Sequence, residues 1–457
     1  METATRRNIY AFGLGTIGRD MVYAMVTMYL IFYLTDILGV SDATLWWING
    51  IILLARIFDA ANDPVMGVIV DNTRTRYGKF KPWIAFGAVF SGIITVLLFT
   101  DFGLTGTAFV VVFGILYLLW GIAYTTNDIS YWSMLPALSM DQKEREKIGS
   151  FAKICANIGL FTVVAGIVPL TTMLGERFDS MTQSYTFFTL ALVVVMWLGQ
   201  AITLIGVKEK KDAFKVEEAT TLKGMLRAII DNDQLLYTAI SMSLFMIGYV
   251  TTTSFGLYFF KYAYGDEGMY SIFAVILGIS QIGALAVFPL FSQRFSRRTL
   301  YTAATILVVV GYLIFFFSPM NMLFIGTAGI LMFLGQAFIQ ILMLMFLADT
   351  VEYGQWKLGK RNESVTFSLQ PFINKIGGAI ASGIVGATVI LSGINSAVVP
   401  SDVSPQGLLL MKIAMMILPL LFILAGYFVY YYRYRIDSDM YQTMLTDLQE
   451  RGDLKLS

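Results

Sequence analysis

The sequence predicts an all-α membrane protein of twelve transmembrane helices, and three observations carry this prediction. The chain of 457 residues is 57% hydrophobic and only 14% charged, whereas soluble domains carry about 25% charged residues. Its apolar residues fall into long runs near the ~20 residues that a helix needs to cross a bilayer. Lys and Arg gather in every second loop between these runs.

Twelve apolar runs follow one another along the chain. The first follows the short polar stretch 1–10, is too long for a signal peptide and has no small-residue cleavage site, so we expect it to be retained as a transmembrane helix. Several runs exceed the bilayer thickness, which predicts tilt or helical extensions into water. The approximate limits of the runs are 9–38, 43–71, 82–101, 106–138, 147–175, 183–207, 235–263, 269–291, 299–318, 321–348, 366–393 and 406–434.

The loop charges predict the orientation in the membrane. Arg6 and Arg7 precede the first run, and clusters of Lys and Arg follow each even-numbered run. In the alternate loops only Arg177 and Lys261 stand out. The positive-inside rule therefore places both termini in the cytoplasm, with the chain in the cell (inner) membrane. The alternation holds over every loop, which supports the count of twelve.

The longest polar stretch divides the runs six and six. It predicts an N-terminal bundle over 1–207, a cytoplasmic linker over 208–233, a C-terminal bundle over 234–435 and a cytoplasmic tail over 436–457. Two six-helix bundles with such a linker are the layout of the major facilitator fold. Within the linker, 221–230 is either a short helix on the membrane surface or a plain tether. Intramembrane carboxylates concentrate in the first half, so we expect that half to supply most of a binding site.

Composition excludes several classes of function. The chain has no histidine, which excludes a His-ligated metal and a histidine proton relay. Its single cysteine, Cys155, excludes an internal disulfide and a cysteine-ligated metal cluster. A net charge of +1 argues against a nucleic-acid partner. No nucleophile–base set is visible, so we expect no enzyme and no cofactor.

Ionisable residues interrupt the second apolar run. Asp59 and Asp63 are spaced i, i+4 and lie on one helical face. An ionisable group in hydrocarbon costs roughly 2.5 to 3.5 kcal/mol by insertion scales, and two carboxylates on one face repel each other unless a cation or proton lies between them. The pattern predicts a cation site; an ion-pair network with Arg56 is the alternative.

The first and fourth runs carry a second polar pattern. Arg19 and Asp20 lie in the first run, and Asp128 and Trp132 share a face of the fourth at spacing i, i+4. A carboxylate accepts hydrogen bonds from sugar hydroxyls and an indole packs on the apolar face of a sugar ring. Trp132 alone is equally typical of an interfacial aromatic belt.

Two lysines also lie within apolar runs. Lys153 is close to the cytoplasmic end of its run and could extend its ammonium group to the membrane surface. Lys375 lies deeper, so it needs a carboxylate partner.

Several stretches together resemble the glycoside–pentoside–hexuronide:cation symporter family of the major facilitator superfamily. They are 59–64 (DAANDP), 74–83 (RTRYGKFKPW), 128–132 (DISYW) and 348–354 (ADTVEYG), with Lys375 where that family keeps a lysine. The similarity runs from about residue 8 to 390 and is closest to the melibiose permeases.

This resemblance implies a role for each matching residue. Asp59, Asp63 and Thr125 match the positions that hold the coupling cation, with Asn62 beside them. The residues that match sugar-site positions, or lie beside them, are Arg19, Asp20, Tyr124, Asp128, Trp132, Lys153, Gln370 and Lys375, and Lys375 also matches the lysine near the cation site. An inner ionic gate between the halves is implied for Arg145, Asp349, Glu352 and Arg361.

The implied function is a symporter that imports a glycoside, such as a galactoside, together with a monovalent cation by alternating access. We expect Na⁺, with Li⁺ or H⁺ as substitutes, and the lipid bilayer as surroundings. The alternative is a proton-coupled sugar or small-metabolite transporter of the same fold. A drug exporter would want a wide apolar pocket instead of Asp20, Asp128 and Trp132, and the tail shows no signalling domain that would indicate a sensor.

Two positions depart from the melibiose permeases. Lys153 stands where they have an arginine, so bidentate contact to a pair of hydroxyls is lost. Pro371 follows Gln370 where a hydroxyl residue is expected, which removes a polar contact and predicts a kink. Both departures bear on the identity of the sugar and leave the cation site intact.

Overall fold

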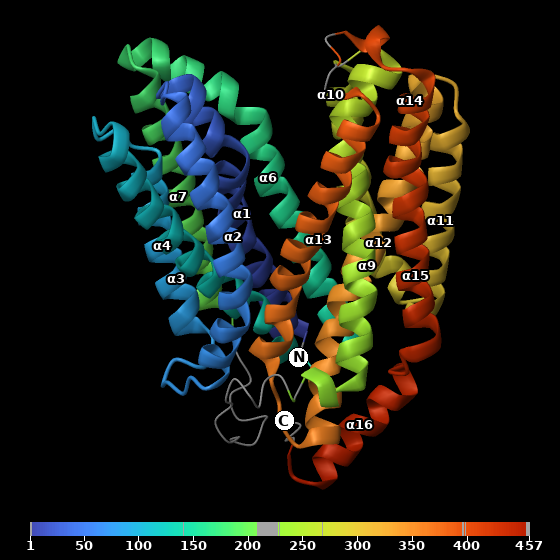
Figure 1. The fold of residues 1–457 in the computed structure, drawn as a ribbon. Helices are drawn as coiled ribbons and strands as arrows, with labels where there is room; N and C mark the ends of the chain where they lie inside the picture. The colour runs from blue at the N-terminus through green and yellow to red at the C-terminus, as the bar shows by residue number, and fades with distance from the viewer. Residues whose placement is uncertain are drawn as a thin grey trace. The chain divides into compact units, whose positions relative to one another are not determined.

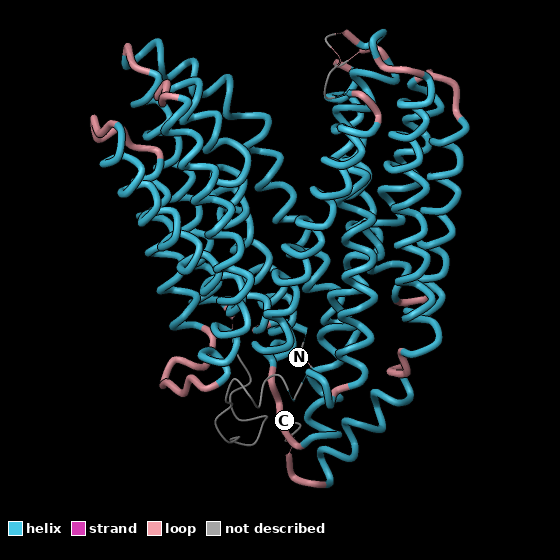
Figure 2. The backbone as a smooth tube through the Cα atoms, in the orientation of Figure 1, coloured by secondary structure: helices cyan, strands magenta, loops and turns pink. Residues whose placement is uncertain are grey.

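The computed structural model describes residues 2–139, 141–207, 227, 229–266, 268–394, 397 and 399–453, which form helices joined by loops and turns. Figure 1 and Figure 2 show the helices as long, roughly parallel rods within each half of the chain. The chain divides into two compact units. Unit 1 is Met1–Met225, Asn362–Ser368 and Lys455–Ser457, and unit 2 is Leu226–Arg361 and Leu369–Leu454. Unit 1 also takes the first turn and a half of a late helix, which the predicted N-terminal bundle did not include.

Unit 1 holds six long helices. In it α1 packs against α6 and α7, α3 against α4 and α7, and α2 against α4. Side-chain caps begin several of them, as where the hydroxyl of Ser41 accepts from the backbone N–H of Thr44 at the start of α2. The helices are α1 (Glu2–Phe32), α2 (Asp42–Asp71), α3 (Lys81–Leu98), α4 (Gly106–Ser133), the short α5 (Leu135–Leu138), α6 (Gln142–Phe178) and α7 (Met181–Gly206).

Unit 2 packs α11 against α12, α9 against α15, and α10 against α12. A π-helical segment, Ile413–Ile417, joins α14 to α15, so the last predicted run is one continuous rod. The helices are α9 (Asp233–Tyr258), α10 (Met269–Ser292), α11 (Arg297–Phe317), α12 (Met322–Leu358), α13 (Glu363–Leu391), α14 (Pro405–Lys412), α15 (Leu418–Arg433) and α16 (Ser438–Glu450). The first residues of α13 belong to unit 1, as given above.

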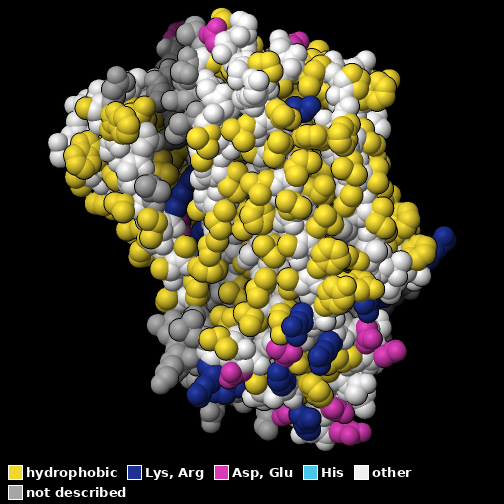
Figure 3. All heavy atoms as spheres, turned by 45° about the vertical axis from the view of Figure 1, so that its right-hand side comes forward, with side chains coloured by type: hydrophobic (Ala, Val, Ile, Leu, Met, Phe, Trp, Pro, Cys, Tyr) yellow, Lys and Arg dark blue, Asp and Glu magenta, His cyan; other side chains and the backbone are white. Residues whose placement is uncertain are grey.

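Within the described residues, eleven helices are long and apolar enough to cross a membrane. α1, with 31 residues, is also long enough, although Arg19 and Asp20 interrupt its apolar sequence. Figure 3 shows hydrophobic side chains over a broad band of one face, with charged side chains gathered at one end. Exposed apolar residues of α11 and α15, such as Ile306, Val310 and Leu421, belong to this kind of surface. A wide apolar surface of this kind is the expected boundary with lipid.

Three predicted segments are corrected or left open by the structure. α12 continues ten residues past the predicted end of its run, because a helix that leaves the membrane keeps its hydrogen bonds and hydropathy marks only the apolar part. α13 continues through Pro371. Most of the predicted linker, 208–226 and 228, lies outside the described residues; 229–231 are helical.

The predicted tail contains α16, a short amphipathic helix that packs on α12. Its apolar side is buried, and Trp356 of α12 donates its indole N–H to Asp447 at 2.8 Å. The buried residues are Tyr441, Met444, Leu445 and Leu448.

Candidate functional site

Arg19 joins two carboxylates inside unit 1. Its Nη1 lies 2.9 Å from Oδ1 of Asp128 on α4, and its Nη2 lies 3.1 Å from Oδ2 of Asp20, its neighbour on α1. The guanidinium is buried with 3% of the side chain exposed, whereas the two acids keep 21% and 23%. Each acid therefore has an accessible edge that can accept a hydrogen bond from a ligand while the other oxygen stays with Arg19.

An aromatic wall lies beside these acids. Tyr23, one turn after Asp20, stacks on Tyr124 of α4 with ring centroids 5.1 Å apart. Tyr124 stacks in turn on Trp120 at 5.3 Å, and the indole N–H of Trp120 donates to the hydroxyl of Thr95 at 3.0 Å. Stacked aromatic rings form a surface of the kind that packs against a ring-shaped ligand.

Trp132 is covered in this structure. The Lys153 ammonium lies 4.4 Å from the centroid of its indole ring, and the Arg19 guanidinium lies 5.4 Å from it. Trp132 is only 5% exposed. A sugar ring can stack on this face only after Lys153 moves aside, so Lys153 acts as a cover on the ring and not as a side chain extended to the membrane surface.

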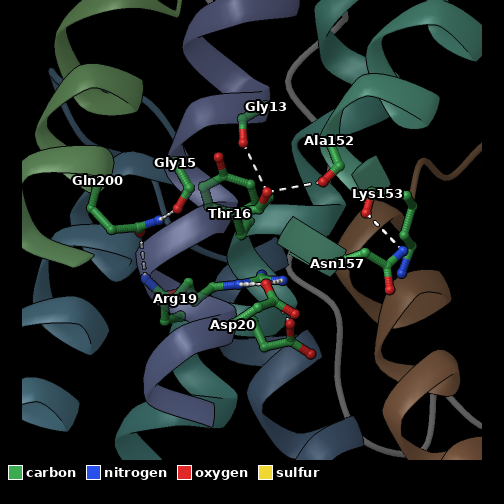
Figure 4. Close-up of polar contacts among 12 residues, drawn as sticks. Gly13, Gly15, Thr16, Arg19, Asp20, Ala152, Lys153, Asn157 and Gln200 are labelled. Atoms are coloured by element: carbon green, nitrogen blue, oxygen red, sulfur yellow. Dashed lines mark hydrogen bonds and ion pairs between the residues drawn. The ribbon is translucent and has the colours of Figure 1, made fainter. Parts of the chain in front are cut away.

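Hydrogen bonds between helices hold this site in position. Figure 4 shows Thr16 of α1 within hydrogen-bonding distance of the carbonyl of Ala152 on α6, at 2.9 Å. Gln200 of α7 donates to the carbonyl of Gly15 at 2.7 Å and accepts from the amide of Asn127 at 2.8 Å. Four helices are thus tied together within about one turn of Arg19 and Asp128, which fixes both charges before a ligand arrives.

The predicted cation site lies on α2 and α4. Asp63 is fully buried, and the Thr125 hydroxyl donates to its Oδ1 at 3.3 Å. Asp59 lies one turn earlier on the same face, and Asn62 is half-buried beside them. Carboxylate and hydroxyl oxygens are the donors that hard cations prefer. Arg56, the partner in the alternative interpretation, has an exposed side chain.

The described residues contain no group of three or more His, Cys, Asp or Glu that could hold a metal ion. A cation bound here would be held by two carboxylates and by neutral oxygens such as that of Thr125. Such a sparse ligand set suits a cargo ion, which has to leave again, better than a permanent structural metal.

Gly121 of α4 makes room for Asp59. A Cβ atom at position 121 would lie 2.6 Å from Oδ1 and 3.2 Å from Oδ2 of that carboxylate. Any larger residue must therefore displace the Asp59 carboxylate. No local pattern singles out this glycine, because the contact joins two helices.

We expect Gly121→Ala to weaken Na⁺ stimulation of uptake at least fivefold, corresponding to about 1 kcal/mol, because it displaces Asp59. Gly283→Ala is the matched control, since a Cβ there meets nothing within 4 Å. Uptake at graded Na⁺ concentrations measures both. A Na⁺ dependence that is the same in Gly121→Ala and Gly283→Ala would show that the position of Asp59 does not matter.

The remaining predicted site residues lie on α13 in unit 2. Gln370 and Lys375 are both half-buried, and they flank the helical turn that contains Pro371. The roles implied for them in sugar and cation binding stay predictions.

Three of the four predicted gate residues form ion pairs within unit 2. Glu352 and Arg361 make a buried ion pair at 3.0 Å, and Arg361 also donates to Gln355 at 3.1 Å. Asp349 pairs with Arg297, a residue that the sequence reasoning missed. Arg145, in unit 1, is fully buried and donates to the carbonyl of Ser139 at 3.1 and 3.2 Å. Asp349 and Glu352 lie on α12 and not in a loop, which corrects the expected end of that helix.

Sequence reasoning also missed a charged cluster at the end of α2. Lys79 lies 2.6 Å from Asp71 and 3.0 Å from Glu363, and Asp71 accepts the backbone N–H groups of Ser364 and Val365 at 3.0 and 2.8 Å. Burial alone would lower the pKa of Lys79, but the two carboxylates raise it above its ordinary value, so the lysine stays charged. Lys79 stood in the quoted stretch 74–83, but nothing in the sequence indicated a partner almost 300 positions away.

Comparison with known proteins decides the family. The family profile described as MFS/sugar transport protein matches residues 11–438. The chain belongs to this family. The family and the relatives below are transporters, which confirms a membrane transporter of the major facilitator type and excludes an enzyme.

Three relatives illustrate the similarity. The lactose permease of Leuconostoc lactis is 30% identical over 456 residues, which cover 96% of this chain and 71% of that protein. The raffinose carrier protein of Pediococcus pentosaceus is also 30% identical, covering 96% and 70%. The structure of the transporter FucP in its outward conformation has a TM-score of 0.62 at 11% identity and covers 92% of this chain and 98% of that one, which shows the common fold. The particular likeness to melibiose permeases stays a prediction.

Proposed function

We propose that the protein is a Na⁺-coupled symporter that imports a neutral glycoside. The observation that carries the proposal is Arg19, held between Asp20 and Asp128 with both acids still partly accessible. Ionised groups in membrane-spanning helices are costly and mark substrate or ion pathways. With Lys153, the site has two positive and two negative side chains. This balance favours a neutral polyhydroxylated ligand over an anionic one.

The chemistry of the site suits a sugar. Asp20 and Asp128 accept charge-assisted hydrogen bonds from hydroxyls, and the Arg19 guanidinium donates to ring or hydroxyl oxygens. The exposed ring of Tyr23, or that of Trp132 once Lys153 shifts, offers an apolar face for the C–H side of the sugar ring. The names of the two carriers above, which mention lactose and raffinose, support the same ligand class.

Helix α4 couples the two sites. Thr125, which contacts Asp63, lies three residues before Asp128, so both project from neighbouring positions of one helix. A cation between Asp59 and Asp63 relieves their repulsion and draws α2 toward α4, which orders Asp128 for the sugar. The coupling is reciprocal and typically worth about 1 to 3 kcal/mol. One charge that moves inward across 100 mV adds about 2.3 kcal/mol of driving force.

A proton is the alternative coupling ion. Two carboxylates on one helical face repel each other, and a proton as well as a metal cation relieves that repulsion. Uptake of labelled galactosides and glucuronides into vesicles, with a Na⁺ gradient or a pH gradient imposed separately, distinguishes the two ions and the two sugar classes. Uptake driven only by the pH gradient would replace Na⁺ by H⁺ in the proposal.

The alternating-access step leads to a prediction for the proposed inner gate. We expect Arg361→Ala to shift the resting population toward the inward-open form, because it removes the buried ion pair with Glu352. Breaking a buried ion pair costs about 3 to 5 kcal/mol. A destabilisation of the closed form of the gate by about 1 kcal/mol raises the ratio of inward-open to closed protein about fivefold.

Alkylation of single cysteines placed at the cytoplasmic and at the opposite ends of the helices measures this shift, in a Cys155→Ser background that has no other thiol. Arg294→Ala is the control, since Arg294 is exposed. Equal accessibility in Arg361→Ala and Arg294→Ala would make the Glu352–Arg361 pair purely structural.

A further inference from the structure

A second polar cluster lies in unit 2, far in sequence from the site described above. Gln281 of α10 donates to the Tyr249 hydroxyl of α9 at 3.0 Å, and the amide of Gln340 on α12 lies beside the same phenol. One turn along α9, Thr252 and Tyr312 are 2.6 Å apart. Four helices of unit 2, α9 to α12, thus bring uncharged polar groups together inside an apolar unit.

Two amide groups in this cluster are incompletely satisfied. Gln336, one turn before Gln340 on α12, is fully buried and reaches the Tyr312 hydroxyl with its Nε2 at 3.4 Å. Within the part of the chain that the structure describes, Oε1 of Gln336 and Nε2 of Gln340 are buried and make no hydrogen bond of acceptable geometry. Buried amide groups almost always have a partner, so these two atoms indicate a ligand that is itself polar.

The unsatisfied atoms form a complementary pair. One is an acceptor and the other a donor, and they lie at spacing i, i+4 on the same face of α12. The Tyr249 phenol accepts from Gln281 and can still donate its own proton. A hydroxyl group donates to an amide oxygen and accepts from an amide nitrogen at the same time, which neither a carboxylate nor an ammonium group can do.

The cluster is accessible at one end. Tyr249 and Gln340 are half-buried, whereas Gln281 and Gln336 are buried. Gln340 lies about 160° around α12 from the exposed Phe324, at 100° per residue. Its side chain therefore does not belong to the apolar face that Phe324 marks.

We propose that Tyr249, Gln281, Gln336 and Gln340 form a binding site for the hydroxyl groups of a neutral sugar. The proposal rests on the proposed function for the ligand class, and it adds a site without charged side chains to the ionic one around Arg19. The ligand is recognised by neutral donors and acceptors alone. A uronate or a sulfonate finds no cation among these four residues.

The test is sugar affinity in Gln340→Leu and Tyr249→Phe, measured by calorimetric titration of the purified protein with lactose, melibiose and raffinose. We expect affinity for the sugar that the wild type binds best to fall at least fivefold in each variant, with Na⁺ affinity unchanged. Thr305→Val is the matched control, since it deletes a buried hydroxyl of unit 2 that bonds only to its own helix. It should keep wild-type affinity.

Singly deoxygenated analogues of that sugar separate direct contact from indirect damage. An analogue that lacks the contacted hydroxyl should bind the wild type more weakly than the parent sugar does. Gln340→Leu should bind the analogue and the parent sugar equally well, because the variant and the analogue each remove the same contact. Unchanged affinity in both variants would mean that the cluster holds buried water only and would overturn the proposal. Equal losses for every analogue would mean general damage and would overturn it too. A wild type that binds none of the three sugars would contradict the proposed function itself.

Discussion

Asp59→Cys and Asp63→Cys are each expected to abolish Na⁺-driven uptake while leaving measurable sugar binding. The two acids lie on one face of α2, with the Thr125 hydroxyl on Asp63, and they are separate from the Asp20–Arg19–Asp128 group. Loss of either carboxylate leaves the cation with a single charged ligand. The coupling free energy then has no source, although the hydroxyl-binding acids remain in place.

Two measurements on the same vesicles test this expectation: Na⁺-stimulated uptake and equilibrium sugar binding. Asp101→Cys is the control, because it makes the same chemical change at an exposed position between α3 and α4. Full Na⁺ stimulation in Asp59→Cys would remove the cation site from α2. Loss of sugar binding as well as of Na⁺ stimulation would mean that the cation and the sugar share one site.

Asp128→Asn is expected to weaken sugar binding at least tenfold, about 1.4 kcal/mol, with far less effect on Na⁺ binding. The substitution keeps the shape but replaces one acceptor oxygen by a donor, so at least one hydroxyl contact fails. A charge-assisted hydrogen bond is worth about 1.5 to 3 kcal/mol. Asp20→Asn should behave similarly, since its carboxylate meets the same guanidinium.

The structure also identifies the charged partner on which the alternative explanation of a loss of sugar binding depends. Asp128 pairs with Arg19 at 2.9 Å, so a purely structural role predicts that neutralising the partner restores binding, because the uncompensated buried charge disappears. Calorimetric titration of Asp128→Asn alone and combined with Arg19→Met, Lys153→Met or Lys375→Met separates the two roles. Recovered affinity in any double variant would make Asp128 a charge partner and not a ligand of the sugar.

Much of this architecture follows from local sequence. Hydropathy located the membrane-spanning helices, because each apolar run is long enough to be recognised without knowledge of the rest of the fold. Helical periodicity placed Asp59 with Asp63, and Asp128 with Trp132, since residues four apart share a face whatever the rest of the fold. Charge in the loops gave the predicted orientation of the termini, which stays a prediction.

What sequence reasoning missed depends on how separate helices meet. Arg19 could not be assigned to Asp128 until α1 was placed against the rest of unit 1, where Gly18 allows a backbone approach: a Cβ there would lie 2.3 Å from Met196. The cover of Lys153 over Trp132 depends on α6 in the same way. The C-terminal end of α12 was not predicted, because hydropathy marks only the part of a helix that lies in the membrane. Long-range pairs such as Asp71 with the start of α13 have no local signal.

Uptake of a labelled galactoside into vesicles at fixed pH, with and without an inward Na⁺ gradient, tests the central claim most directly. Wild-type protein is expected to accumulate the sugar only with the gradient, and Asp59→Cys should remove that difference while Asp101→Cys keeps it. Accumulation that is equal with and without Na⁺, in wild type and in Asp59→Cys alike, would contradict cation-coupled sugar symport through this site.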